Sequence, residues 1–345
     1  MRTKPYVGIR PPGDEAGRAE RLHRRTAPYG LDIHSVVQSR WIVVVKAFTC
    51  DHYVVPLPPG HRFPMEKYRL LREAVVSSGV LLAEDIFAPE LATDQQILRA
   101  HDHAYVEKVK AGKLRDKEVR RIGFPWSPEL VRRTRCSVGG TISACRAALD
   151  DGVAANLAGG THHAFRNHGQ GYCIFNDCVI AIRAMQAEKR IQRAVILDGD
   201  VHQGNGTAAL ATDDPTIFTF SVHGDRNYPA RKERSDLDIG LKDGTGDSDY
   251  LDAWDSGLRR ALKQASGDLA IYLAGADAYW DDRLGHLAMS KAGLAERDRL
   301  VFERCARANM PVATVMAGGY ARDIRDTVEI HLQTVRVAVE SLAHL

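Results

Sequence analysis

Short apolar runs alternate with amphipathic stretches along most of the chain. The first run, residues 41–48, predicts a strand, although Lys46 interrupts its apolar side chains. Five later runs have the length and the continuous apolar character of buried parallel strands. They lie at residues 154–158, 194–197, 216–222, 269–274 and 312–316. The pattern therefore predicts a sheet that is largely parallel.

Helical periodicity occupies the segments between these runs. It predicts helices over residues 65–76, 95–110, 132–149, 176–188 and 290–309. Strands that alternate with helices form βαβ units, in which helices cover both faces of the sheet. The predicted fold class is therefore α/β, with a central parallel sheet flanked by helices.

Residues 1–40 differ from the rest of the chain. They show no sustained apolar periodicity, and they carry eight basic side chains against four acidic ones. This composition favours a basic tail that is flexible or loosely docked, with a nucleic-acid-binding arm as the alternative. We therefore divide the chain into a tail, residues 1–40, and one main domain, residues 41–345.

Composition narrows the class of protein. The chain has 345 residues, of which 44% are hydrophobic and 26% charged, as expected for a soluble protein with a core. A net charge of +3 is too small to indicate nucleic-acid binding by itself. No run approaches the roughly 20 apolar residues of a membrane span. Six cysteines without CxxC spacing, and no apolar signal peptide, predict a reduced, cytoplasmic protein.

Glycine and polar residues follow each of the five later runs. These segments are Gly159–His163, Asp198–Gly206, His223–Asp225, Gly275–Asp277 and Gly318–Tyr320. Open α/β sheets bind ligands beyond the carboxyl ends of their strands. We therefore expect these ends to converge on one pocket.

The segment after the second of these runs contains candidate metal ligands. Asp198, Asp200 and His202 alternate with other residues, so an extended chain places all three on one face. With Asp277 from another strand end, a carboxylate and an imidazole from this set make three protein ligands and leave a position open, as catalytic zinc requires. The alternative is that the aspartates only cap the following turn.

Two further groups have suitable chemistry. His162 and His163 follow a strand and a double glycine, and histidine titrates near neutral pH, which suits proton transfer. The alternative for this pair is a solvated loop. Tyr320 is either a core aromatic or a phenol that donates a hydrogen bond to a developing oxyanion.

These motifs, in this order, resemble the zinc-dependent histone deacetylase superfamily. Gly60–Lys67 and Gly171–Asp177 add to the resemblance, which covers about residues 41–340. The segments Gln203–Gly206 and Asp282–Gly285 are most similar to its class IV branch, histone deacetylase 11 and bacterial relatives. The resemblance implies an arginase/deacetylase fold.

The resemblance also implies a role for individual residues. Zinc is expected on Asp200, His202 and Asp277, with His162 and His163 serving the attacking water, Asp198 orienting His162, and Tyr320 polarising the acyl carbonyl. A structural potassium ion is expected near Asp198, Asp200, His202, Ser221 and Val222. The acyl-lysine tunnel is expected between Gly171, Tyr172, Tyr228 and Leu284.

Two departures from the class I pattern stand out. Class I enzymes carry an Asp in a rim loop that holds the substrate backbone, where this chain has Gly123–Trp126. Class I enzymes also pair the second histidine with Asp, where this chain, like class IV relatives, has Asn205. The predicted activity is removal of an acyl group, acetyl or longer, from protein lysine side chains.

Three alternatives differ in chemistry. One is deacetylation of small acylated amines such as acetylpolyamines. Another is a binuclear manganese ureohydrolase on the same fold, which needs additional carboxylates where the chain has Gln203, Gly204 and Asn205. The last is a non-catalytic reader of acyl-lysine. The expected partner is an acylated protein or amine, with neither a membrane nor nucleic acid.

Overall fold

The computed structural model describes residues 45–342. The predicted tail, residues 1–40, and the start of the first predicted strand lie outside this range. Within it, eight strands form one sheet in which every neighbouring pair is parallel. Their order is β2-β1-β3-β8-β7-β4-β5-β6. The predicted parallel α/β sheet is confirmed.

The strands are short, and half of them, β3, β4, β7 and β8, are buried at every position. They are β1 (Lys46–Phe48), β2 (Ile86–Phe87), β3 (Val153–Asn156), β4 (Ala194–Asp198), β5 (Ile217–Gly224), β6 (Leu237–Leu241), β7 (Leu269–Leu273) and β8 (Val312–Val315). All six predicted strands are present in the described range. The two edge strands, β2 and β6, were not predicted; β2 has only two residues, and β6 has one buried position, Leu237, after which exposed and half-buried positions alternate.

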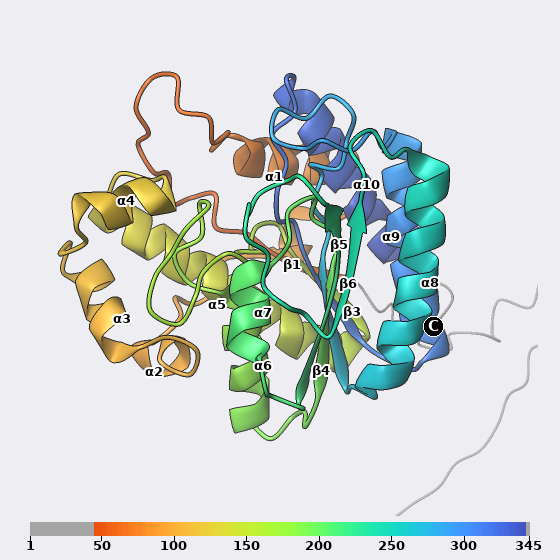
Figure 1. Ribbon diagram of the computed structural model, residues 1–345, viewed down its shortest axis with the longest axis horizontal. Coiled ribbons are helices and arrows are strands. Elements are labelled where there is room, and N and C mark those ends of the chain that lie inside the picture. The colour runs from red at the N-terminus through yellow and green to blue at the C-terminus, as the bar shows by residue number, and fades with distance from the viewer. Residues whose placement is uncertain (1–44, 343–345) are drawn as a thin grey trace, which may run out of the picture. The chain divides into compact units, whose positions relative to one another are not determined.

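Helices cover both faces of the sheet. They are α1 (Lys67–Ser77), α2 (Asp94–Ile97), α3 (His103–Lys110), α4 (Asp116–Ile122), α5 (Pro128–Asp151), α6 (Asp177–Ala187), α7 (Asn205–Ala211), α8 (Asp247–Ala265), α9 (Lys291–Arg307) and α10 (Ile324–Leu342), with a 3-10 turn at Ala83–Asp85. Figure 1 shows α5, α6 and α7 on one face and α8, α9 and α10 on the other. Among residues 45–342, no helix is long and apolar enough to span a bilayer.

Two hydrophobic cores result, one on each face. In β4, Val195 and Leu197 join the core under α8 and α9, whereas Ala194 and Ile196 join the core under α5 and α6. Because side chains alternate along a strand, a strand covered on both faces needs apolar residues at every position. This is why the buried strands appear as continuous apolar runs in the sequence.

One predicted helix, residues 95–110, is wrong as a single element. The structure breaks it into α2 and α3 around His101, which turns into the interior. The His101 ring accepts a hydrogen bond from the Asn176 amide (2.9 Å) at Nε2 and donates from Nδ1 to the Phe165 carbonyl (2.9 Å). These tertiary bonds replace the helical ones across the break, which local periodicity does not reveal.

Candidate active site

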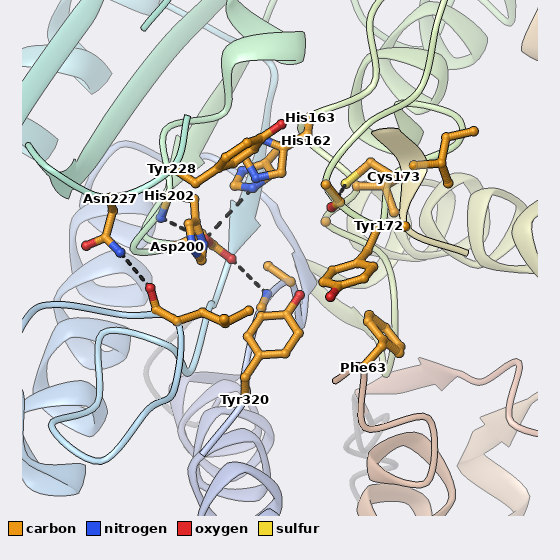
Figure 2. Close-up of a pocket in the computed structure, with 18 of the residues that line it drawn as sticks. Phe63, His162, His163, Tyr172, Cys173, Asp200, His202, Asn227, Tyr228 and Tyr320 are labelled. Carbon is orange, nitrogen blue, oxygen red and sulfur yellow. Dashed lines mark hydrogen bonds and ion pairs between the residues drawn. The ribbon is translucent and has the colours of Figure 1, made fainter. Parts of the chain in front are cut away.

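Four adjacent central strands deliver the candidate residues. The segment after β3 carries His162 and His163, and the segment after β4 carries Asp200 and His202. Asp277 follows β7, and Tyr320 follows β8. Because β3, β8, β7 and β4 lie side by side in a parallel sheet, these segments leave its same edge. They surround a cavity of about 470 Å³ (Figure 2).

The fifth predicted strand end contributes differently from our expectation. His223 and Asp225, which follow the apolar part of β5, do not line the cavity. Instead Asn227 and Tyr228, a few residues further along, form part of its wall. The peptide bond between Tyr228 and Pro229 is cis.

The candidate metal ligands come together and are buried. Asp200, His202 and Asp277 each offer one donor atom within 4.8 Å of the other two. Nδ1 of His202 lies 2.9 Å from Oδ1 of Asp200 and 3.2 Å from Oδ2 of Asp277. Asp198 is not a member of this group: β4 ends at Asp198, and its carboxylate turns to His162. The expectation that Asp198, Asp200 and His202 share one extended face is therefore wrong.

Turn capping by the aspartates also occurs. Oδ1 of Asp198 accepts a hydrogen bond from the Asp200 amide (3.1 Å), and Oδ1 of Asp200 accepts one from the His202 amide (2.9 Å). These bonds fold the chain back after β4. The same turn points Asp200 and His202 at Asp277, so capping and ligand placement coincide here.

Three observations indicate that this cluster can hold a divalent metal ion. Oδ2 of Asp277 is buried, and although Nδ1 of His202 lies 3.2 Å away, it does not donate a hydrogen bond to this oxygen. Burial raises the pKa of Asp277, and the neighbouring Asp200 carboxylate raises it further, a repulsion that a cation would remove. A Cβ atom on Gly318 would lie 1.9 Å from Oδ2 of Asp277, so only glycine leaves room beside the carboxylates. Two carboxylates and an imidazole are donors that zinc accepts.

The two histidines have different partners. Nδ1 of His162 bonds Oδ2 of Asp198 (2.7 Å), and Nδ1 of His163 bonds Oδ1 of Asn205 (2.8 Å). The rings lie 4.1 Å apart between centroids. Both are buried, so the alternative of a solvated loop is wrong.

The partners set opposite protonation preferences. Burial alone would lower the pKa of His162, but the Asp198 and Asp200 carboxylates outweigh it and raise the value to about 9. His163 has no carboxylate partner. Burial, together with the positive charges of His162 and His202, holds its pKa well below the ordinary value. A neutral His163 with hydrogen on Nδ1 keeps a free lone pair on Nε2.

Tyr320 lines the cavity opposite the histidines, so it is not a core aromatic (Figure 2). Burial, followed by the Asp277 and Asp200 charges, raises the pKa of its phenol well above the ordinary value, so the hydroxyl remains a donor. Its backbone amide donates to Oδ2 of Asp282 (2.6 Å), while Oδ1 of Asp282 accepts from the Leu284 amide (2.8 Å). Asp282 thus joins Tyr320 to the tunnel wall.

The predicted tunnel residues all line the cavity. Gly171, Tyr172, Tyr228 and Leu284 are joined there by Phe63. In Figure 2, Phe63 and Tyr172 lie across the cavity from His202 and Tyr228. Gly171 has φ +54°, and a Cβ atom there would approach Cδ2 of His163 to 2.7 Å. The glycine therefore lets the tunnel wall pass directly over the candidate base.

Three buried charged residues that support this site were given no role by sequence reasoning. Arg297 of α9 donates to the carbonyls of Gly199 (3.0 Å) and Gly275 (2.7 Å), next to the two ligand loops. Asp177 accepts from the amides of Gly160 (2.9 Å) and Thr161 (2.7 Å), just before the histidine pair. Lys67 donates to the Ala317 carbonyl (3.2 Å), beside the Tyr320 loop.

The sequence gives signals of different strength for these three residues. Asp177 and Lys67 belong to the quoted motifs, which could have prompted a role for each. Arg297 lies three residues after Leu294 and four before Val301, on the apolar face of its helix. A charged residue at an apolar-face position is the signal that could have identified it.

Three of the residues expected near potassium, Asp198, Ser221 and Val222, lie on the neighbouring strands β4 and β5. Asp198 of β4 is paired in register with Ser221 of β5, and Val222 follows. The hydroxyl of Ser221 is bonded to Nδ1 of His223 (2.9 Å). The structure thus places Asp198, Ser221 and Val222 on adjacent strands.

Comparison with known proteins decides the family. A model of the histone deacetylase domain matches residues 61–335. The chain belongs to the histone deacetylase family. Histone deacetylase 2 of Arabidopsis thaliana is 32% identical over 329 residues, which cover 91% of this chain and 83% of that protein. An uncharacterised protein of Picosynechococcus is 47% identical over 286 residues, 83% of this chain and 95% of that protein.

Two further relatives of this chain come from Bacillus subtilis and Aquifex aeolicus. The acetoin utilization protein AcuC of Bacillus subtilis is 30% identical over 250 residues, covering 66% of this chain and 64% of that protein. The crystal structure of a histone deacetylase homologue from Aquifex aeolicus superposes with a TM-score of 0.75 at 19% identity, over 86% of this chain and 84% of that one. The arginase/deacetylase fold is thereby confirmed.

Proposed function

We propose that this histone deacetylase family member is a zinc-dependent amidohydrolase that removes an acyl group, acetyl or longer, from protein lysine side chains. One observation carries the proposal. Asp200 and His202 of the buried Asp-His-Asp cluster line the same cavity as His163, with its free Nε2, and the Tyr320 phenol. Amide hydrolysis needs an activated water, a base and an oxyanion donor, and these groups match those needs.

Asp200, His202 and Asp277 would hold the zinc. When bound, zinc supplies Lewis acidity, which polarises a carbonyl and acidifies water. The chain's own residues do the rest. Nε2 of His163 accepts the proton of the attacking water while Asn205 fixes the ring, and Tyr320 donates to the oxygen that gains charge. A protonated histidine of the pair returns a proton to the leaving amine.

The chemistry of the donor set argues against the binuclear manganese alternative. Among residues 45–342, Asp200, His202 and Asp277 form the sole group of three clustered candidate ligands. The segment after His202 supplies Gln203 and Asn205, both engaged elsewhere: Gln203 bonds the Glu233 carbonyl, and Asn205 bonds His163. We therefore propose one catalytic metal, with a structural potassium ion near Asp198 and Ser221. The class IV assignment and the cytoplasmic location stay predictions from the sequence.

The test is an activity screen of zinc-reconstituted protein. Substrates are peptides with acetyl-lysine and with longer acyl-lysines, beside acetylated polyamines. Hydrolysis of acyl-lysine peptides, abolished by His163→Ala with zinc still bound, is the expected result. Turnover of acetylpolyamines alone would favour the small-amine alternative. Binding of acyl-lysine peptides without turnover would favour a reader and overturn the proposal.

A further inference from the structure

The mouth of the cavity carries positive charge that no described residue neutralises. Arg120 and Arg121 lie in the last turn of α4 and line the cavity. Both side chains are exposed, and neither forms an ion pair or a side-chain hydrogen bond with any residue between 45 and 342. Arg115, which precedes the same helix, is instead bonded to Glu118 (2.9 Å) and does not line the cavity.

Backbone hydrogen bonds hold this helix end against the tunnel wall. The carbonyl of Arg121 accepts from the Gly171 amide (3.1 Å), and that of Ile122 accepts from the Tyr172 amide (2.7 Å). Gly171 and Tyr172 form the wall above His163. The two arginines are therefore attached to the same wall along which a substrate must pass.

No acidic side chain at the mouth offsets these charges. Among the residues that line the cavity, Asp200 is the only carboxylate, and it belongs to the metal-ligand cluster at the floor. Asp243, which does not line the cavity, lies 3.5 Å from the guanidinium of Arg226 and 3.7 Å from the ring of His286. An approaching substrate therefore meets a mouth that is positive on the α4 side.

Helix stability alone does not account for this arrangement. A basic residue in the last turn of a helix is favoured by the helix dipole wherever it points. That preference does not require that the side chains line a cavity or that acidic residues be missing from its rim.

We propose that Arg120 and Arg121 select acyl-lysines that lie in acidic peptide segments, with Asp or Glu next to the modified lysine. The inference rests on the proposed function and names its substrate class. Exposed charges at a pocket entrance act through attraction and steering that salt screens. The same charges disfavour acetylpolyamines, whose remaining amines are cationic.

The test compares acetyl-lysine peptides that differ only in flanking residues: Asp, Asn or Lys on both sides. We expect kcat/KM to be about tenfold higher with Asp than with Lys at low ionic strength, and the ratio to shrink toward one in about 0.5 M salt. Arg120→Gln/Arg121→Gln should remove the preference, and Arg120→Glu/Arg121→Glu should reverse it. Lys117→Glu, on the same helix but outside the cavity, should leave it unchanged.

Two outcomes separate this inference from the proposed function. Equal kcat/KM for all flanks, or a preference for Lys, overturns the role of the arginines while hydrolysis itself stands. If no peptide is hydrolysed, fluorescence anisotropy with the labelled peptides decides. Tighter binding of the Asp-flanked peptide, lost in Arg120→Gln/Arg121→Gln, supports the inference, and equal binding overturns it.

Discussion

The floor of the cavity and its mouth are held in place by different kinds of contact. At the floor, the ligand loops are fixed by fully buried charged residues, above all Arg297, whose exposed fraction is 0%. At the mouth, α4 is fixed by main-chain hydrogen bonds, and the side chains of Arg120 and Arg121 form no ion pair with any residue in the described range 45–342. Side chains at the floor therefore determine geometry, whereas side chains at the mouth can change without disturbing the fold.

The most severe test of the floor removes a metal ligand. Asp277→Ala should abolish tight zinc binding and with it all measurable turnover, because two ligands do not complete the site. Metal content by mass spectrometry after dialysis and a peptide assay provide the measurement. Asp225→Ala, an exposed carboxylate outside the cavity, is the matched control and should keep both. Full zinc content in Asp277→Ala would refute the ligand assignment.

The next test removes the buried support. Arg297→Met should lower the free energy of unfolding by about 3–5 kcal/mol, because it leaves the buried Asp298 carboxylate unpaired. Chemical denaturation measures the loss. Arg226→Met, an exposed arginine beside Asp243, should change stability by less than about 0.5 kcal/mol. A similar small change for both variants would show that Arg297 does not support the floor.

A hydroxyl deletion tests the wall between floor and mouth. Tyr320→Phe should lower kcat by about 10²–10³ with an unchanged melting temperature, since it removes an oxyanion donor and little packing. Tyr172→Phe removes a hydroxyl from the tunnel wall and should alter KM more than kcat. Steady-state kinetics beside thermal melts distinguish the two. Near-normal kcat in Tyr320→Phe would indicate that Tyr320 contributes packing and no oxyanion hydrogen bond.

The subtlest test changes one charge beside the base. Asn205→Asp places a carboxylate on Nδ1 of His163 and should raise the pKa of that ring, which now lies well below its ordinary value. A base with a raised pKa stays protonated to higher pH, so the acidic limb of kcat/KM should move upward by about one to three pH units. Asn167→Asp makes the same change beside Nδ1 of His168 outside the cavity and is the control. An unmoved limb would exclude His163 as the base.

The sequence predicted the central strands and the residues behind them for one physical reason. Strands buried on both faces must be apolar throughout, and ligand-binding residues must follow their carboxyl ends. His162, Asp200, Asp277 and Tyr320 satisfy that rule, so a local pattern was enough to find them. The expected extended face failed because the chain turns after β4, where the carboxylates of Asp198 and Asp200 accept from the amides of Asp200 and His202.

Other features depend on long-range packing. Arg297 and Arg299 are near neighbours in the same helix, but only Arg297 is buried, since its guanidinium reaches carbonyls 98 and 22 residues away in the chain. Helix α8 was missed although Tyr250, Trp254, Leu258 and Ala261 repeat every three or four residues on its buried face. That periodicity was a usable signal. The arginines of α4 have no such signal, because lining a cavity leaves no pattern in sequence.

The position of β8 has a consequence for how the protein is made. Among residues 45–342 it is the last strand, yet it lies between β3 and β7 in the middle of the sheet. A nascent chain that has not yet released residue 315 from the ribosome therefore lacks the strand that joins the two halves of the sheet, and it also lacks Tyr320. Activity should thus appear only after β8 and Tyr320 have been released, and chains that terminate before β8 should be inert and open at two strand edges.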